Sequence, residues 1–208
     1  MARTADHEQR RRQVAEALMA VVGERGLART TLADVADHAG VSIGLVQRYF
    51  RSKAQLLRFG VEHMYHRAEQ RLQEISTGPE PVASVRDWLD RATETLLPLD
   101  DERVRELTVW LEFLPAALAD PEMLRMHRDA TLALADALTE ALEIAVREGE
   151  LPADRDPRAE AVALIACVDG LTLHHLVTAE PFTAEAVRAA LTTHLDRLFT
   201  APESPRTR

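Results

Sequence analysis

The sequence predicts an all-α protein, and three observations lead to that prediction. Apolar residues recur at the three- and four-residue spacing of a helix along most of the chain, and no run alternates as a half-buried strand does. Only 8 glycines and nine aromatic residues (five Phe, two Tyr and two Trp) occur among 208 residues. Near the N-terminus, two short apolar segments flank a glycine turn. With 46% hydrophobic residues, the chain is long enough to bury a core of its own.

The glycine turn separates two short helices. Apolar residues between Leu32 and Ala39 share one helical face, and Gly40 can take the left-handed conformation that ends a helix. Ser42 is an N-cap residue for a second helix that runs to about Tyr49. A helix, a tight turn and a second helix form the layout that places a recognition helix in the major groove of DNA. The segment therefore predicts a helix-turn-helix.

Caps and helix breakers divide the rest of the chain. Gly26 ends a first helix, and Ser52 caps a fourth in a capping box with Gln55. Asp120-Pro121 and Asp156-Pro157 each combine an N-cap residue with a proline at the first helical position. The predicted helices outside the helix-turn-helix cover about residues 8–24, 52–75, 82–97, 101–118, 121–148, 157–179 and 184–199.

Nine helices are therefore expected, in two domains. Residues 1–52 form a three-helix DNA-binding head, and residues 53–200 form a helical body. Residues 201–208 are expected to be a disordered tail, because they follow the last helix and contain few apolar groups.

The charge is unevenly distributed between these parts. The net charge is −9, but residues 1–60 carry ten Lys and Arg against six Asp and Glu. The remaining residues carry 15 basic side chains against 28 acidic ones. A basic head on an acidic body suits a protein that meets phosphate at one end only, although ordinary solvated helix surface is an alternative explanation.

Cysteine content and hydropathy indicate the compartment. Cys167 is the only cysteine, so no disulfide can form within the chain, and its apolar neighbours favour an inert thiol. The longest unbroken apolar stretch, residues 161–168, is shorter than the ~20 residues of a membrane span. The first residues are polar and charged, unlike a signal peptide. We expect a cytoplasmic protein with no membrane partner.

Residues 8–60 resemble the DNA-binding domain of the tetracycline-repressor (TetR) family of bacterial regulators. The residues that match are Gly26, Thr30-Thr31, Val35-Ala36, Ala39-Gly40-Val41-Ser42, Tyr49-Phe50 and Ser52-Lys53. The number and lengths of the helices fit as well, so the resemblance extends over nearly the whole chain. It implies a nine-helix TetR-like fold whose body dimerises and binds a ligand.

Five residues of the expected recognition helix are candidates for base contacts: Ile43, Gly44, Leu45, Gln47 and Arg48. Gly44 would let the backbone approach the DNA closely. Gln47 can bond adenine and Arg48 guanine through two hydrogen bonds, each worth ~1–3 kcal/mol of discrimination. Ile43 or Leu45 can pack against a thymine methyl. In related repressors the position of Gln47 is often tyrosine, so no known operator sequence is transferred to this chain.

Four residues are expected to contact phosphates: Thr31, Ser42, Tyr49 and Lys53. Lys53 is the only lysine and follows the cap of the fourth helix, where free N–H groups and the helix dipole favour an anion. Such contacts fix the register of the protein on DNA and do not read sequence. The Arg10-Arg11-Arg12 cluster is a further candidate for phosphate, with a solvated helix face as the alternative.

The eighth predicted helix is apolar around much of its circumference, so it is expected to pack on more than one side, and the ninth carries one apolar stripe. A single monomeric core is the alternative to pairing with a second copy. By the family resemblance they pair across a two-fold axis. The expected interface consists of Val168, Gly170, Leu171, Val187, Leu191, Leu195 and Leu198. Residues 110–113, 120–122 and 168–171 also resemble the body of choline-operon (BetI-like) repressors, although this body type serves regulators of many pathways and choline is not inferred.

The resemblance places an effector pocket in the body. Its expected lining is Met64, Trp88, Trp110, Phe113, Met126, His127, Cys167 and His174, with Asp169 as a further polar group. Each of these residues has an ordinary packing role as the alternative. The histidine pairs do not supply three or four converging ligands, so neither a metal nor another cofactor is expected.

The leading function is thus a homodimeric, ligand-responsive transcriptional repressor that binds a palindromic operator. The alternatives are a DNA-binding activator or architectural dimer without a small-molecule effector and, in another class, a helical ligand-binding protein or enzyme. The sequence contains no Ser/His/Asp set, phosphate loop or metal cluster that predicts catalysis, so no catalytic residue is expected.

Overall fold

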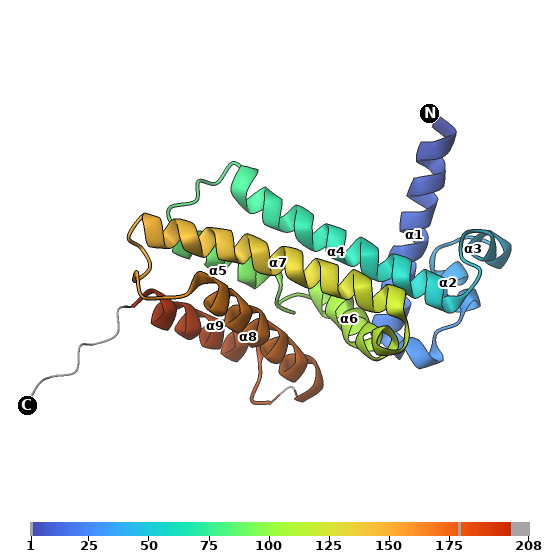
Figure 1. Ribbon diagram of the computed structural model, residues 1–208. Coiled ribbons are helices and arrows are strands. Elements are labelled where there is room, and N and C mark those ends of the chain that lie inside the picture. Colours follow the sequence, from blue (N-terminus) through green and yellow to red (C-terminus); the bar gives the residue numbers. More distant parts are fainter. Residues whose placement is uncertain (1, 179, 201–208) are drawn as a thin grey trace, which may run out of the picture. The chain divides into compact units, whose positions relative to one another are not determined.

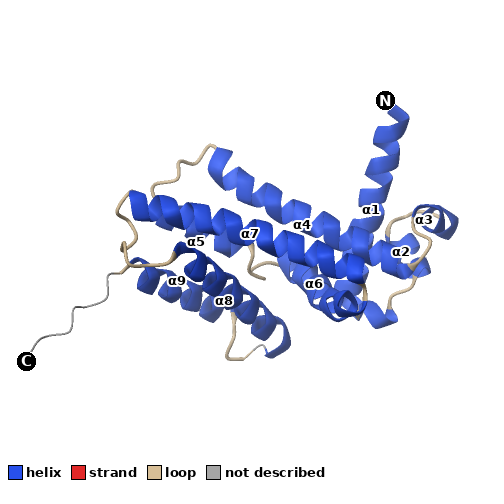
Figure 2. Ribbon diagram, viewed as in Figure 1, coloured by secondary structure: helices blue, strands red, loops and turns tan. Residues whose placement is uncertain are grey.

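The computed structural model describes residues 2–178 and 180–200, with side chains from residue 9 onward. The predicted tail, residues 201–208, lies outside this range. Within it every long element is a helix and no strand occurs (Figure 2). The α-helices are α1 (Ala2–Arg25), α2 (Leu32–His38), α3 (Ile43–Tyr49), α4 (Lys53–Thr77), α5 (Val85–Thr95), α6 (Asp101–Ala119), α7 (Pro121–Arg147), α8 (Pro157–Thr178) and α9 (Ala184–Phe199). The all-α, nine-helix prediction is confirmed for the described residues.

The helix ends follow the predicted caps, with two additions to the predicted pattern. A 3₁₀ turn, η1 (Leu27–Arg29), connects α1 to α2. Thr31 caps α2, while the Thr30 side chain is buried and donates to the carbonyl of Gly26 at 2.9 Å. In the box before α4, Ser52 accepts from the backbone N–H of Gln55, but the Gln55 side chain accepts from Arg51.

The chain forms two compact units, and each contains segments that are distant in sequence (Figure 1). Unit 1 comprises Met1–Glu69 and Asp100–Arg128, and unit 2 comprises Gln70–Leu99 and Asp129–Arg208. No break falls at the expected boundary after residue 52. The first part of α4 and all of α6 belong with the helix-turn-helix, because α6 packs against α1.

One core joins the helix-turn-helix to α4 and α6 within unit 1. Leu18 of α1, Val46 of α3, Val61 of α4 and Phe113 of α6 are each fully buried in it. On α6 the buried side chains recur as Glu106, Val109, Phe113 and Ala117, which is one helical face. The short helices α2 and α3 therefore derive their stability from tertiary packing, because isolated helices of seven residues do not form in water.

Gly60 of α4 lies against the side chain of Leu18 in α1. A Cβ at Gly60 would lie 2.8 Å from Cδ2 of Leu18, a side chain with no exposed surface. We expect Gly60→Ala to lower the free energy of unfolding by ~1–3 kcal/mol through overpacking. Gly44→Ala is the matched control, since the same Cβ meets nothing closer than 4.0 Å there. Urea unfolding that shows equal or higher stability for Gly60→Ala would contradict this packing.

Unit 2 contains α5, α8, α9 and most of α7, and α9 packs against both α5 and α8. The carboxylate of Glu150, in the loop after α7, accepts from the backbone N–H groups of Val85 and Arg86 at 3.1 and 3.2 Å. It thus satisfies two donors in the first turn of α5, in addition to the cap that Ser84 supplies. This contact joins the start of α5 to the loop after α7, two segments that are 65 residues apart in the sequence.

The core of unit 2 contains most of the residues that were expected at the dimer interface. The stripe of α9 that was expected to pair with a second copy is buried inside the subunit, together with Val168 of α8. The buried residues of this set are Val168, Val187, Leu191, Leu195 and Leu198. The sequence showed that these helices need partners but could not distinguish a partner within the subunit from one outside it.

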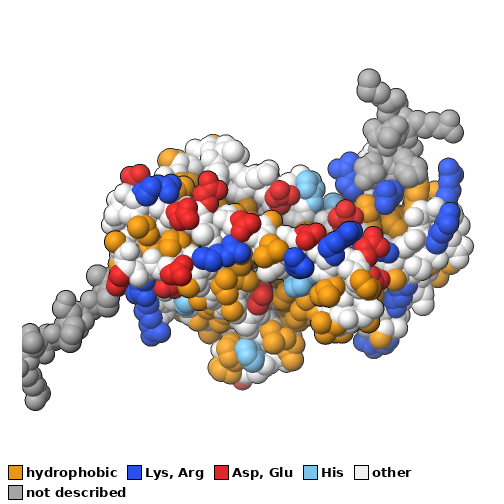
Figure 3. All heavy atoms as spheres, in the orientation of Figure 1, with side chains coloured by type: hydrophobic (Ala, Val, Ile, Leu, Met, Phe, Trp, Pro, Cys, Tyr) orange, Lys and Arg blue, Asp and Glu red, His pale blue; other side chains and the backbone are white. Residues whose placement is uncertain are grey.

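The outer face of α8 remains apolar. Val162, Leu173 and Val177 are 54%, 42% and 70% exposed, and they share one face of the helix with Ala163 and Ala166. In Figure 3 hydrophobic side chains gather over the segment that Figure 1 labels α8. By length and a mean hydropathy of 1.6, α8 is the one helix within the described residues that could cross a membrane. That is weak evidence, because a helix of a soluble protein passes the same test.

Candidate DNA-reading surface and effector site

The helix-turn-helix is held together by side-chain caps and by α1. Thr31 and Asp34 form a reciprocal capping box at α2, and the hydroxyl of Ser42 accepts from the N–H of Leu45 at α3. Gly40 has a φ of +65°, as the turn between the two helices requires. The Gln13 side chain of α1 donates to the carbonyl of Ala39 at 2.8 Å and thereby fastens the end of α2.

The exposed face of α3 consists of Ile43, Gly44, Gln47 and Arg48. These residues stand at i, i+1, i+4 and i+5, so they lie on one side of the helix, while Val46 fills the core on the other side. Leu45 is half-buried and lies less favourably for a base contact than expected. The Cβ position of Gly44 has no neighbour closer than 4.0 Å, so the backbone is open to a ligand at that point.

The expected phosphate contacts differ in how they are placed. Ser42 uses its oxygen lone pair for the cap, so its hydroxyl proton is available to a phosphate. Tyr49 is half-buried and makes an edge contact with Phe50 at a centroid distance of 6.5 Å. The ammonium of Lys53 donates to the carbonyl of Leu27 and ties the start of α4 to η1. Lys53 therefore has a structural role in unit 1, and its ammonium has two further N–H donors for the predicted phosphate contact.

Thr31 is engaged at the start of α2. Its hydroxyl donates to the carboxylate of Asp34 at 2.6 Å, and the side-chain hydrogen bond from Thr31 holds the pKa of Asp34 below its usual value. The donor that a phosphate would need is therefore in use, beside a negative charge. Thr31 is a capping residue in this structure.

The arginine cluster on α1 also has a packing role. The guanidinium of Arg11 lies 4.4 Å from the ring centroid of Phe59 and 5.8 Å from that of Phe50. This cation–π arrangement seats Arg11 against the core, so it is not simply part of a solvated face. Arg12 is exposed.

Unit 1 contains a half-buried aromatic cluster that includes two of the expected effector residues. The rings of Trp110 and His127 are 6.3 Å apart, and Tyr65 lies 6.4 Å from His127. The Tyr65 hydroxyl and Nδ1 of His127 are 2.8 Å apart, so they share a hydrogen bond. Met126 packs beside this cluster, against the core of unit 1. The cluster combines flat apolar surfaces with two polar groups, as small-molecule sites do.

The other expected lining residues are placed differently. Met64 is 5% exposed and Phe113 fully buried, so both are core residues of unit 1. Trp88, Cys167 and His174 belong to unit 2. The indole N–H of Trp88 donates to Ser76 at 2.9 Å, and the exposed ring of His174 stacks on Phe182 at 4.6 Å. Burial raises the pKa of the half-buried Cys167 thiol, which disfavours the reactive thiolate.

Two features of unit 1 were missed at the sequence level. Tyr65 follows Met64 directly, and nothing in its spacing distinguishes it from other half-buried residues. Glu106 is 3% exposed and lies 3.3 Å from Nε of Arg67. The sequence does contain a pattern that indicates the burial of Glu106, because this residue continues the apolar stripe of Val109 and Phe113 by one helical turn. A carboxylate in such a stripe predicts a buried ion pair.

Two histidines make the stability of the protein depend on pH. Burial lowers the pKa of His63 and of His127 below the ordinary 6.5, so the unfolded chain takes up protons before the folded one. Their contribution to stability is present above pH 6.5 and is lost as the pH falls through the folded pKa values. Burial raises the pKa of Asp169 to about 6, which acts in the opposite direction over the same range. The expected result is therefore a difference: between pH 7.5 and 5.5 a His63→Gln/His127→Gln double variant should lose less free energy of unfolding than the unchanged chain.

The exposed His66 supplies the control for this measurement, because His66→Gln removes a histidine from the same helix as His63. Urea unfolding at the two pH values gives the difference directly. A double variant that lost as much stability on acidification as the unchanged chain and His66→Gln would contradict the assignment.

Comparison with known proteins adds independent information. Residues 14–58 match the family model "Bacterial regulatory proteins, tetR family", and residues 85–200 match "BetI-type transcriptional repressor, C-terminal". The chain is 28% identical over 203 residues to the HTH-type transcriptional regulator PksA of Bacillus subtilis, covering 95% of this chain and 94% of PksA. It is 34% identical over 167 residues to the regulator TtgR of Pseudomonas putida, covering 79% of each chain.

The fold has close counterparts among solved structures. The SmeT–triclosan complex superposes with a TM-score of 0.72 at 25% identity, covering 96% of this chain and 98% of that one. The capped helix-turn-helix with its exposed α3 face thus coincides with the segment that matches the DNA-binding family model. The chain belongs to the TetR family of DNA-binding transcriptional regulators and has a BetI-type C-terminal region.

Proposed function

We propose that this protein is a homodimeric, cytoplasmic repressor that binds a palindromic operator and releases it when a small molecule binds. The observation that carries the proposal is the exposed face of α3, with Gln47 and Arg48 directed away from a core that contains Val46. A helix so placed presents two side chains able to form paired hydrogen bonds with bases, on a backbone that Gly44 leaves open. The protein acts through DNA and not as an enzyme.

The proposed dimer forms through the outer faces of α8 and α9. On α8 the face consists of Val162, Ala163, Ala166, Leu173 and Val177. On α9 the exposed side carries the small residues Ala186, Ala190 and Thr193 at helical spacing. Small side chains allow a second helix to approach closely, and exposed apolar surface of this extent favours a partner. Two copies related by a two-fold axis would bury both faces.

The proposed effector site is the cluster of Tyr65, Trp110 and His127. An aromatic or cationic organic molecule suits two aromatic rings and an imidazole that is neutral at pH 7. Tyr65 and Lys53 lie on the same helix, twelve residues and therefore ~18 Å apart along α4. An effector that moves Tyr65 therefore moves the start of α4, which Lys53 ties to η1 beside the helix-turn-helix. Repression is relieved to the extent that the effector binds the displaced state more tightly.

The test is footprinting of the purified protein on the DNA upstream of its own coding region, with and without a panel of aromatic and cationic compounds. The expected result is a protected inverted repeat whose protection is lost with at least one compound. A variant with Tyr65→Phe and His127→Gln should keep the footprint and lose the response to that compound. A footprint that no compound releases favours the alternative of a DNA-binding dimer without an effector.

A further inference from the structure

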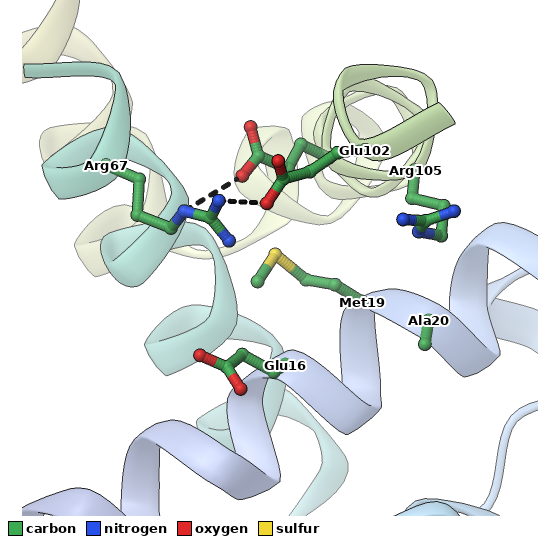
Figure 4. A pocket seen from close by; sticks show the side chains of 7 residues that line it. Glu16, Met19, Ala20, Arg67, Glu102 and Arg105 are labelled. Carbon is green, nitrogen blue, oxygen red and sulfur yellow. Dashed lines mark hydrogen bonds and ion pairs between the residues drawn. The ribbon is translucent and has the colours of Figure 1, made fainter. Parts of the chain in front are cut away.

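A partly open cavity lies in unit 1, outside the aromatic cluster. Helices α1, α4 and α6 border a volume of about 500 Å³, within the range of about 300–1,000 Å³ that small-molecule sites occupy (Figure 4). Glu16 and Met19 of α1 face it from one side, and Arg67 of α4 with Arg105 and Glu106 of α6 from the others. Neither Tyr65, Trp110 nor His127 lines it.

One wall of this cavity is a closed set of ion pairs. Arg67 pairs with Glu102, and its Nε lies 3.3 Å from the buried carboxylate of Glu106. Burial works against the charge of Arg67, but the two carboxylates outweigh that effect and raise the pKa of the guanidinium. These three side chains satisfy one another and form a rigid wall, so they are not the groups that would bind a ligand.

Two other charges facing the cavity lie outside this set of ion pairs. The Glu16 side chain is 60% exposed and lies 4.0 Å from Nε2 of His63, and its charge acts on Arg67 at longer range without a direct ion pair. Burial lowers the pKa of His63, so the imidazole is neutral at pH 7 and does not balance Glu16. Across the residues that the structure describes, Arg105 has no ion pair and no side-chain hydrogen bond, and its stem lies beside Gly23, where an added Cβ would be 3.0 Å from Cγ of Arg105. The cavity thus offers one carboxylate and one guanidinium.

We propose that this cavity binds a small aminocarboxylate, with its ammonium group against Glu16 and its carboxylate against Arg105. Met19, which lies between the two in Figure 4, would contact the intervening methylene groups. A guanidinium and a carboxylate are the groups that recognise such a molecule with paired, charge-assisted hydrogen bonds. The site is separate from the proposed aromatic effector site, so a second small molecule could bind to the same subunit.

The spacing of the two charges favours a long aminocarboxylate over an α-amino acid. Arg105 is placed beside Gly23, which is seven residues and therefore ~10 Å along α1 from Glu16. In an α-amino acid the ammonium and the carboxylate are attached to the same carbon, so they cannot reach both side chains. An ω-amino acid, whose charged groups are separated by several methylene groups, can reach both Glu16 and Arg105. A ligand of that kind would bridge α1 and α6 and thereby stabilise unit 1.

Calorimetric titration of the full chain with 5-aminopentanoate tests the proposal. Pentylamine and pentanoate each carry one of the two charges, and glycine carries both at short separation. We expect 5-aminopentanoate to bind at least about tenfold more tightly than any of these three. Glu16→Gln and Arg105→Gln should each weaken its binding by a similar factor, while Arg125→Gln, a surface arginine of α7 outside the cavity, should leave it unchanged.

The readout is direct binding in the absence of DNA, so its result does not depend on the proposed repressor function. Equal affinities for all four compounds, no heat at millimolar ligand, or unchanged binding by both cavity variants would each overturn the proposal. Circular dichroism of the two variants checks that they fold, which is expected because both side chains are exposed.

Discussion

Replacing Arg48 with alanine is expected to lower the affinity for the operator by about 10- to 100-fold per half-site, and the effect should be restricted to specific DNA. The expectation follows from the position of Arg48 on the exposed face of α3, beyond the buried Val46. A paired hydrogen bond to a base contributes ~1–3 kcal/mol, and in a dimer two copies are lost at once. Fluorescence anisotropy with operator and scrambled duplexes measures both affinities.

Two further variants serve as controls for the effect of Arg48→Ala on specific binding. Arg147→Ala removes an exposed arginine from the last turn of α7 and should change neither affinity. Lys53→Ala should weaken binding to every sequence alike and reduce the salt dependence by about one ion, as expected for a phosphate contact. Unchanged selectivity in Arg48→Ala would show that α3 does not read bases in the way proposed.

Leu173→Arg is expected to convert the protein to a monomer and to reduce operator affinity by a factor of the order of 100 or more. Leu173 is 42% exposed on the apolar face of α8, so a charge there costs little in the free subunit. In the proposed dimer the same guanidinium would be buried against a second copy of α8 without a partner. Because two linked half-site contacts bind far more tightly than one, the loss of the dimer also weakens DNA binding.

Sedimentation velocity on the variant and on Ile144→Arg separates this effect from a general one. Ile144 is 36% exposed on α7, and arginine at that position should leave the dimer intact. If Leu173→Arg sediments as the unchanged protein does, the dimer does not use this face of α8.

The sequence predicted local structure well because the signals are local. Ser42, Gly40, the Asp120-Pro121 pair and the Asp156-Pro157 pair act on backbone groups within one helical turn, so they mark helix ends wherever the chain folds. The helix-turn-helix was recognisable for the same reason. The roles of Thr30 and Thr31 are not distinguishable in this way, because the two adjacent threonines differ in which one the tertiary fold buries.

The candidate sites were less predictable because apolar periodicity does not identify the partner of a face. Leu191 and Leu195 looked like an interface stripe and are core, while Val162 and Val177 are the exposed residues. Trp110 and His127 were found as candidates, but Tyr65 was not, since its link to His127 spans 62 residues. Contacts over such separations leave no pattern in a single sequence.

The sequence by itself thus determined the helical class, the helix-turn-helix and the ends of most helices, all of which depend on interactions over one or two turns. Only the tertiary structure decided which apolar helix faces are buried inside the subunit. It also placed Glu106 against Arg67 and formed the cavity that Glu16 and Arg105 line. The physical reason is that burial and charge pairing depend on segments brought together from distant parts of the chain, and a residue's own neighbours do not specify them.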